Sequence, residues 1–272
     1  MLQHPTNRGL VFTRNEILSE ARGRYLAWLD QDDFQHPERL ARQVEYLERY
    51  PNISLLSSWT DVLVQGTPDG DHSYTKVMPT RHEDIRAQML FTNPVACNTV
   101  MMRRNDFANL GLAFREYFGN TLDYDLWSRA SDTLQFAGIK ESLCTYRVHP
   151  DQTSRGTELT RMGNQALQVQ LDLIERTLQI SASATQSETH RKISQPAFIG
   201  LQSSDLADVL EWLSILRRQN LVLRAFDGKS LDRVLVRQWL AILRSLSRTD
   251  SSLTLKHTWQ GIRHIGISPL DL

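Results

Sequence analysis

Helix-like and strand-like segments alternate along residues 1–155, and this alternation constrains the fold more than any other feature of the chain. Short apolar runs predict strands, whereas apolar residues three and four positions apart predict helices. The expected strands are residues 25–29, 53–64 and 98–103, and the expected helices are residues 14–22, 37–50, 82–91 and 122–131. Such βαβ alternation predicts an α/β sandwich with a mostly parallel sheet.

The pattern changes after about residue 155. An apolar stripe at helical spacing runs from Leu167 to Leu178. Residues 181–195 are polar and almost without bulky apolar groups, which predicts a linker. Two further amphipathic helices are expected at about 204–219 and 230–246. We therefore expect two domains, residues 1–155 and a helical C-terminal region of residues 156–272.

Charge and cysteine content exclude several classes of protein. Lysine plus arginine and aspartate plus glutamate each number 31, so no global field draws the chain to nucleic acid. Cys97 and Cys144 are too few for a disulfide framework. The sequence has neither a run of ~20 apolar residues nor the apolar region of a secretory signal at its start. These features predict a cytoplasmic protein, and they leave room for peripheral contact with the inner face of a membrane.

An acidic turn follows the expected strand at residues 25–29. Asp30, Asp32 and Asp33 place three carboxylates within four positions, where they repel one another unless a positive group lies among them. Mg²⁺ or Mn²⁺ with oxygen ligands meets that need. Ligands also tend to bind at the carboxyl ends of strands in open α/β sheets. The alternative is a solvated turn in which Asp33 helps to start the helix near Pro37, and the turn alone does not decide between them.

The residues around this turn form one continuous signature. In chain order it contains the patterns N-x-G, A-R-N, A-x-G-x-Y and D-x-D-D, with Thr13 in place of the alanine of A-R-N. This signature resembles that of family 2 glycosyltransferases. The matching positions are Asn7, Gly9, Arg14, Asn15, Ala21, Gly23, Tyr25, Asp30, Asp32 and Asp33, followed by P-E-R-L at Pro37 to Leu40.

Two later clusters resemble the same family in the same order. Residues 122–127 are similar to the family's E-D-Y-D-L-W segment, with Leu122 in place of the glutamate. The alternative is a purely structural role, in which Asp123 and Asp125 lie in the first turn of a helix and are favoured there by the helix dipole. Residues 146–149 resemble the Y-R-x-H element that closes the GT-A domain. A lone histidine such as His149 is more often a surface or packing residue, but three clusters in order are hard to assign to coincidence.

The resemblance implies a GT-A-like, Rossmann-like sandwich that transfers a sugar from a nucleotide-diphosphate donor to an acceptor hydroxyl. It implies a UDP-sugar donor, a glycan or lipid-linked acceptor, inversion of configuration and a hexosyltransferase role in polysaccharide or glycoconjugate biosynthesis. Mg²⁺ or Mn²⁺ would neutralise the departing diphosphate.

The same resemblance assigns roles to individual residues. Asp123 would be the general base, and Asp32 the main metal ligand with His149 near the metal or phosphates. Asp30 would face the ribose or share the metal, and Asp33 would belong to the donor-binding turn. For Arg14 the choice lies between a phosphate contact and packing, with packing favoured.

The family's opening strands are not found in this sequence. A first strand near the uracil-binding loop and a second strand ending in D-D-G-S normally precede the signature, and a βαβ unit needs at least ~30 residues. We therefore expect a GT-A fold that lacks its first strands, with uncertain activity for the chain by itself. The alternative is a catalytically dead remnant that acts as a binding or scaffold module. A different metal-dependent phosphotransfer enzyme would need a phosphate-cradling glycine motif, which the sequence lacks.

Overall fold

The computed structural model describes residues 4–67, 70–149, 157–195, 200–247 and 255–267. The chain divides into two compact units, one of residues 1–85 with 93–166 and one of residues 86–92 with 167–272. In chain order the elements are α1 (Leu10–Glu20), β1 (Tyr25–Ala27), β2 (Phe34–Gln35), α2 (Arg39–Arg49), β3 (Ile53–Val64), β4 (His72–Lys76), α3 (His82–Gln88), the 3₁₀ helix η1 (Cys97–Thr99), β5 (Met101–Arg103), α4 (Arg104–Asn109), the 3₁₀ helix η2 (Glu116–Thr121), α5 (Leu122–Ala130), β6 (Gln135–Val148), α6 (Thr157–Leu178), α7 (Ala184–Ser194), the 3₁₀ helix η3 (Ser203–Asp205), α8 (Leu206–Leu223), α9 (Gly228–Leu246) and α10 (Leu255–Ile265).

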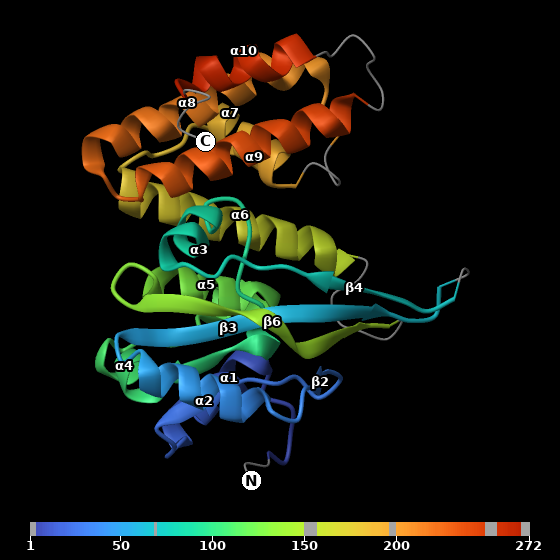
Figure 1. Ribbon diagram of the computed structural model, residues 1–272, viewed down its shortest axis with the longest axis vertical. Helices are drawn as coiled ribbons and strands as arrows, with labels where there is room; N and C mark the ends of the chain where they lie inside the picture. The colour runs from blue at the N-terminus through green and yellow to red at the C-terminus, as the bar shows by residue number, and fades with distance from the viewer. Residues whose placement is uncertain (1–3, 68–69, 150–156, 196–199, 248–254, 268–272) are drawn as a thin grey trace. The chain divides into compact units, whose positions relative to one another are not determined.

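A six-stranded sheet forms the centre of the first unit (Figure 1). Its strand order is β1-β5-β3-β6-β2, and β4 pairs with the part of β3 that β5 leaves free. Only β3 and β6 pair in parallel among the described strands, and the other neighbours are antiparallel. The expectation of a mostly parallel sheet is therefore wrong. The reason is that β5 lies antiparallel between β1 and β3, although β1, β3 and β6 share one direction.

Several local predictions agree with the structure. β3 spans Ile53–Val64 and α5 spans Leu122–Ala130, close to the expected ranges. The first helix begins at Leu10, four residues earlier than expected, and the apolar run that follows it pairs as a strand only over Tyr25–Ala27. Its continuation still joins the sheet region, because the Trp28 amide donates to the Val100 carbonyl at 3.0 Å.

Helix α2 packs on the sheet through a face that is partly polar. Leu47 lies in a core cluster with Leu56, Met101 and Ala137. One and two turns before Leu47, the fully buried positions are Gln43 and Arg39. Leu40, which lies at helical spacing before Val44 and Leu47 in the sequence, is 44% exposed. Buried polar groups need partners, and backbone carbonyls next to β1 and β5 supply them.

Arg39 shows how those partners are supplied. Its Nη2 donates to the carbonyls of Trp28 at 2.8 Å and Val100 at 3.2 Å, and its Nε donates to Gln43 Oε1 at 3.0 Å. Gln43 Nε2 in turn donates to the Thr99 carbonyl at 2.7 Å. These bonds hold the backbone just before the acidic turn, so α2 fixes the position of residues 30–33.

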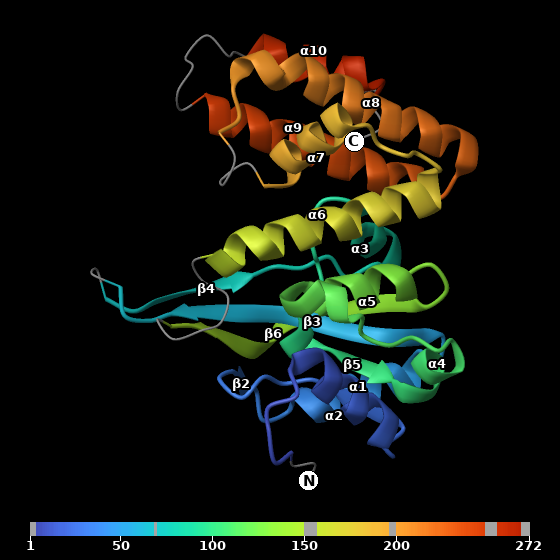
Figure 2. The same ribbon diagram turned by 180° about the vertical axis from the view of Figure 1, so that it is seen from behind.

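The second unit is helical, with α8, α9 and α10 packed on one another and α7 packed on α8 (Figures 1 and 2). Residues 184–194 form α7, so the prediction of a linker at 181–195 is wrong. The composition misleads because the helix is stabilised at its start and by burial. Ser183 and Gln186 form a capping box, and His190 is fully buried.

His190 is held by both of its ring nitrogens. Its Nε2 lies 2.9 Å from the Leu90 carbonyl, and its Nδ1 accepts from Trp212 Nε1 at 3.0 Å. The Phe91 ring stacks on the imidazole with centroids 5.0 Å apart. Burial lowers the pKa of His190 to about 4, so the ring is neutral. Two short-range partners from residues 90–91 thus anchor α7 to the core of this unit.

None of the helices within the described residues is both long enough and apolar enough to span a bilayer.

Candidate functional site

The acidic turn connects β1 to β2, and Asp33 is its buried member. Asp33 is 7% exposed and accepts from Asn98 Nδ2 at 2.7 Å and from the Arg147 amide at 3.0 Å. Burial raises the pKa of Asp33 to about 6, against the effect of these two hydrogen bonds. Asp33 does not cap α2, whose N-cap is Glu38. The turn is thereby tied to η1 and to the end of β6.

Asp32 and His149 lie together at the same edge of the sheet. His149 Nε2 is 3.3 Å from Asp32 Oδ2, although 117 positions separate the two residues in the chain. The side chains are 20% and 39% exposed for His149 and Asp32, so solvent and ligands can reach the pair. The structure thus brings the D-x-D-D turn into contact with the Y-R-x-H element.

Asp32 and His149 offer a divalent cation one carboxylate and one imidazole, which is fewer ligands than a complete metal site needs. No group of three His, Cys, Asp or Glu side chains with metal-binding geometry occurs within the described ranges. Magnesium sites usually take one or two carboxylates from the protein and complete their shell with water and substrate phosphates. Asp32 would supply the carboxylate of such a site, with the His149 imidazole beside it.

Asp30 is engaged by Arg14 of α1. Arg14 Nη2 donates to Asp30 Oδ1 at 2.9 Å, and Nη1 donates to Cys97 Sγ at 3.1 Å. The guanidinium also lies 5.3 Å from the Trp28 ring and 5.9 Å from the Phe114 ring. The Arg14 side chain is 9% exposed, whereas that of Asp30 is 45% exposed. Arg14 is therefore a buried cation that pairs with the acidic turn, and the Asp30 side chain remains accessible to solvent.

Asp123 stands in the first turn of α5. Its Oδ1 accepts from the Tyr124 amide at 2.8 Å, and its Oδ2 accepts from Asn93 Nδ2 at 3.0 Å. Burial raises the pKa of Asp123, and the positive charge of Arg14 is the largest effect that opposes the rise. Arg14 also interacts with Asp30. A single buried cation therefore links the carboxylate of α5 to the acidic turn.

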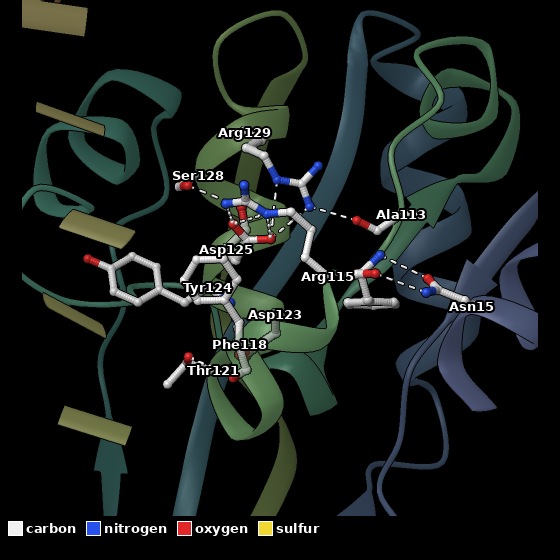
Figure 3. A network of polar contacts seen from close by, with 11 residues as sticks. Asn15, Ala113, Arg115, Phe118, Thr121, Asp123, Tyr124, Asp125, Ser128 and Arg129 are labelled. Carbon is white, nitrogen blue, oxygen red and sulfur yellow. Dashed lines mark hydrogen bonds and ion pairs between the residues drawn. The ribbon is translucent and has the colours of Figure 1, made fainter. Parts of the chain in front are cut away.

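Asp125, two positions later, has a different environment (Figure 3). Its side chain is 1% exposed and forms ion pairs with Arg115 and Arg129. Arg129 Nη2 donates to Asp125 Oδ2 at 2.8 Å and to the Ala113 carbonyl at 2.6 Å. Residues two apart on a helix point about 200° away from each other. The two carboxylates accordingly have separate partners, and Asp125 fixes the segment before α5.

Several residues around the site were not singled out from the sequence. Asn93 and Asn98 hold Asp123 and Asp33, and Arg39 holds the backbone before the turn. A signal was present, because polar residues interrupt the otherwise apolar stretch 89–102. Periodicity alone does not show which distant carboxylate such an amide meets.

Comparisons with known proteins match the N-terminal part of the chain to one family. Residues 1–111 match the family model described as Glycosyl transferase family 2. An "Uncharacterized glycosyltransferase" of Haemophilus influenzae is 31% identical over 159 residues, which is 57% of this chain and 49% of the relative. "Putative glycosyltransferase EpsE" of Bacillus subtilis is 28% identical over 152 residues, 56% of this chain and 52% of the relative. The chain thus spans about half the length of these relatives.

Two further comparisons carry more specific names. The "UDP-Glc:alpha-D-GlcNAc-diphosphoundecaprenol beta-1,3-glucosyltransferase WfaP" of Escherichia coli is 27% identical over 164 residues, covering 58% of this chain and 59% of the relative. Among solved structures, S. aureus TarS 1-349 in complex with UDP-GlcNAc is similar at a TM-score of 0.48 and 12% identity, over 86% of this chain and 73% of that chain.

Proposed function

We propose that this chain, whose residues 1–111 match the Glycosyl transferase family 2 model, transfers a sugar from a nucleotide-diphosphate donor to an acceptor hydroxyl with inversion. The observation that carries the proposal is the convergence of three separate segments. Asp32 meets His149, and Arg14 donates to Asp30 and interacts electrostatically with Asp123. Residues 1–155 would carry the reaction, with residues 156–272 as a separate helical region.

The donor would bind at the acidic turn. Asp32 and His149 would hold Mg²⁺ or Mn²⁺, Asp30 would face the ribose or share the ion, and Asp33 with Arg14 would keep the turn in place. When bound, the ion would neutralise charge on the departing diphosphate. The partly exposed side chains of Asp30 and Asp32 support this arrangement, because a ligand can reach them.

The choice of substrates follows the named relatives. The E. coli relative is named as using UDP-Glc and a diphosphoundecaprenol-linked acceptor, which supports a UDP-sugar donor and a glycan or lipid-linked acceptor here. Such an acceptor is consistent with polysaccharide or glycoconjugate biosynthesis. We place the reaction in the cytoplasm, with peripheral contact at the inner face of the membrane.

Asp123 would act as the general base. Its carboxylate would take the proton of the acceptor hydroxyl as that oxygen attacks the anomeric carbon of the donor. The bond from this carbon to the diphosphate oxygen would break, and the bonding electrons would leave with the nucleotide diphosphate. Arg14, the Tyr124 amide and the Asn93 amide stabilise the ionised carboxylate that the step requires.

The test replaces the charge of Asp123 and leaves its size unchanged. Asn cannot accept a proton at neutral pH, so Asp123→Asn should lower the rate of UDP release with acceptor by ~10²–10⁴-fold. Calorimetry should show nearly unchanged affinity for UDP with Mg²⁺. The control is Asp132→Asn at an exposed position just after α5, which should keep full activity.

Two results would contradict the proposal. Full transfer activity in Asp123→Asn would remove the base assignment. A wild-type chain that binds UDP but releases none from UDP-sugars with undecaprenyl-diphosphate-linked sugars would favour the binding or scaffold module.

A further inference from the structure

Asn93 occupies a bend in which both ends of its side-chain amide are used. Its Oδ1 accepts from the Val95 amide at 3.0 Å, across Pro94, and its Nδ2 donates to Asp123 Oδ2 at 3.0 Å. The backbone N–H of Val95 can only donate. The oxygen of the Asn93 amide must therefore face Val95, which leaves the NH₂ group to face Asp123.

The second oxygen of Asp123 is held independently. Oδ1 accepts from the Tyr124 amide at 2.8 Å, within the first turn of α5. Each carboxylate oxygen thus receives at least one N–H donor, and these donors fix the plane of the group. A carboxylate oxygen can accept more than one hydrogen bond, so both retain capacity for an acceptor hydroxyl.

Charged and titratable groups from other elements also face Asp123. They are Arg14 of α1, Lys76 at the end of β4 and Cys97 of η1. Burial raises the pKa of Cys97 to about 12, so the thiol is neutral. Lys76 is exposed as a residue, but burial of its ammonium group lowers its pKa. The negative charge of Asp123 opposes this decrease. Arg14 and Lys76 supply long-range attraction, whereas Asn93 contributes a directed hydrogen bond.

We propose that Asn93 is a positioning residue for the proposed base: its amide, oriented by the Val95 backbone, fixes the Asp123 carboxylate and favours its ionised form. This inference rests on the proposed function, in which Asp123 must be ionised before it takes the acceptor proton. Asn93 does not touch the substrate in this scheme, so its effect would pass entirely through Asp123.

Two substitutions separate the roles of the two ends of the amide. Asn93→Asp keeps an oxygen to accept from the Val95 amide, so the bend is retained while the donor toward Asp123 is replaced by a like charge. Asn93→Ala removes the donor without adding charge. Hydrogen bonds to the charged form lower a carboxyl pKa and nearby like charges raise it, so both changes should raise the pKa of Asp123, and Asn93→Asp should raise it more.

The measurement is the ¹³C NMR titration of the Asp123 carboxyl carbon in the intact chain, assigned with Asp123→Asn. We expect an upward shift of about one pH unit in Asn93→Ala and a larger one in Asn93→Asp. The acidic limb of kcat/KM for transfer should move by the same amount. The matched control is Asn120→Ala, because Asn120, three positions before Asp123, donates through Nδ2 to Glu158 Oε2 at 3.1 Å rather than to Asp123. Asp123 should titrate there as in the wild type.

The outcomes separate the two proposals. An Asp123 titration that is unchanged in both Asn93 variants overturns the positioning role, even if Asp123→Asn abolishes transfer. If the Asp123 titration shifts in the Asn93 variants while Asp123→Asn keeps full activity, Asn93 positions the carboxylate but Asp123 is not the base.

Discussion

Removing the charge of Asp125 should destabilise the protein without touching the proposed chemistry. Its buried carboxylate pairs with Arg115 and Arg129, whose side chains are 46% and 21% exposed. Arg115 Nε lies 3.1 and 3.0 Å from the two carboxylate oxygens, and Arg129 Nε lies 3.2 Å from one of them. Asp125→Asn keeps the volume of the side chain but leaves the two cations with a neutral partner.

The magnitude follows from this burial. Breaking a fully buried ion pair by removing one partner costs ~3–5 kcal/mol. Here the asparagine oxygen still accepts one hydrogen bond and Arg115 is half in solvent, so we expect about 2–4 kcal/mol of lost unfolding free energy. For a domain of this size, that loss corresponds to a Tm decrease of roughly 5–15 °C.

The control is an ion pair with similar geometry on the surface. Arg42 donates through both Nε and Nη2 to Glu38 Oε2, and these side chains are 40% and 60% exposed. Glu38→Gln should therefore cost less than ~1 kcal/mol. Urea denaturation followed by tryptophan fluorescence and thermal melting by circular dichroism measure both variants. If Asp125→Asn lost no more stability than Glu38→Gln, the structural role assigned to Asp125 would be refuted.

Three further predictions concern other parts of the chain. Burial lowers the pKa of His190 from its ordinary value of 6.5 to about 4. Between pH 4 and pH 6.5 the imidazole is therefore protonated in the unfolded chain and neutral in the folded protein. Unfolding free energy should therefore fall as pH drops below about 6.5, by up to ~1.4 kcal/mol per pH unit, and urea titrations should show a weaker dependence in His190→Gln. Gly261→Ala should destabilise by ~1–3 kcal/mol in the same assay, because its Cβ would lie 2.2 Å from the Trp239 ring, whereas Gly228→Ala meets nothing within 4 Å and should be neutral. Asp32→Ala should abolish the Mg²⁺-dependent part of UDP binding in calorimetry, and equal wild-type binding in EDTA would contradict the metal role.

Local patterns in the sequence determined the α/β class, the helical C-terminal region and the positions of several elements. β3 could be predicted at Ile53–Val64 because a run of apolar and β-branched residues depends little on distant partners. The acidic turn, the start of α5 and the end of β6 were likewise recognisable as three clusters with a shared family signature. Their chemical roles remain predictions, but their grouping could be anticipated from residue types and spacing.

Only the tertiary structure decided how distant segments pair. It placed β5 antiparallel between β1 and β3, and it folded the polar stretch after Ser183 into α7 by burying His190. It also selected the partner of each carboxylate, since His149 lies 117 positions from Asp32 and Asn93 lies 30 positions from Asp123. The physical reason is that burial, pKa and hydrogen bonding depend on groups that the fold brings within a few ångströms, and residue spacing along the chain carries no record of those distances.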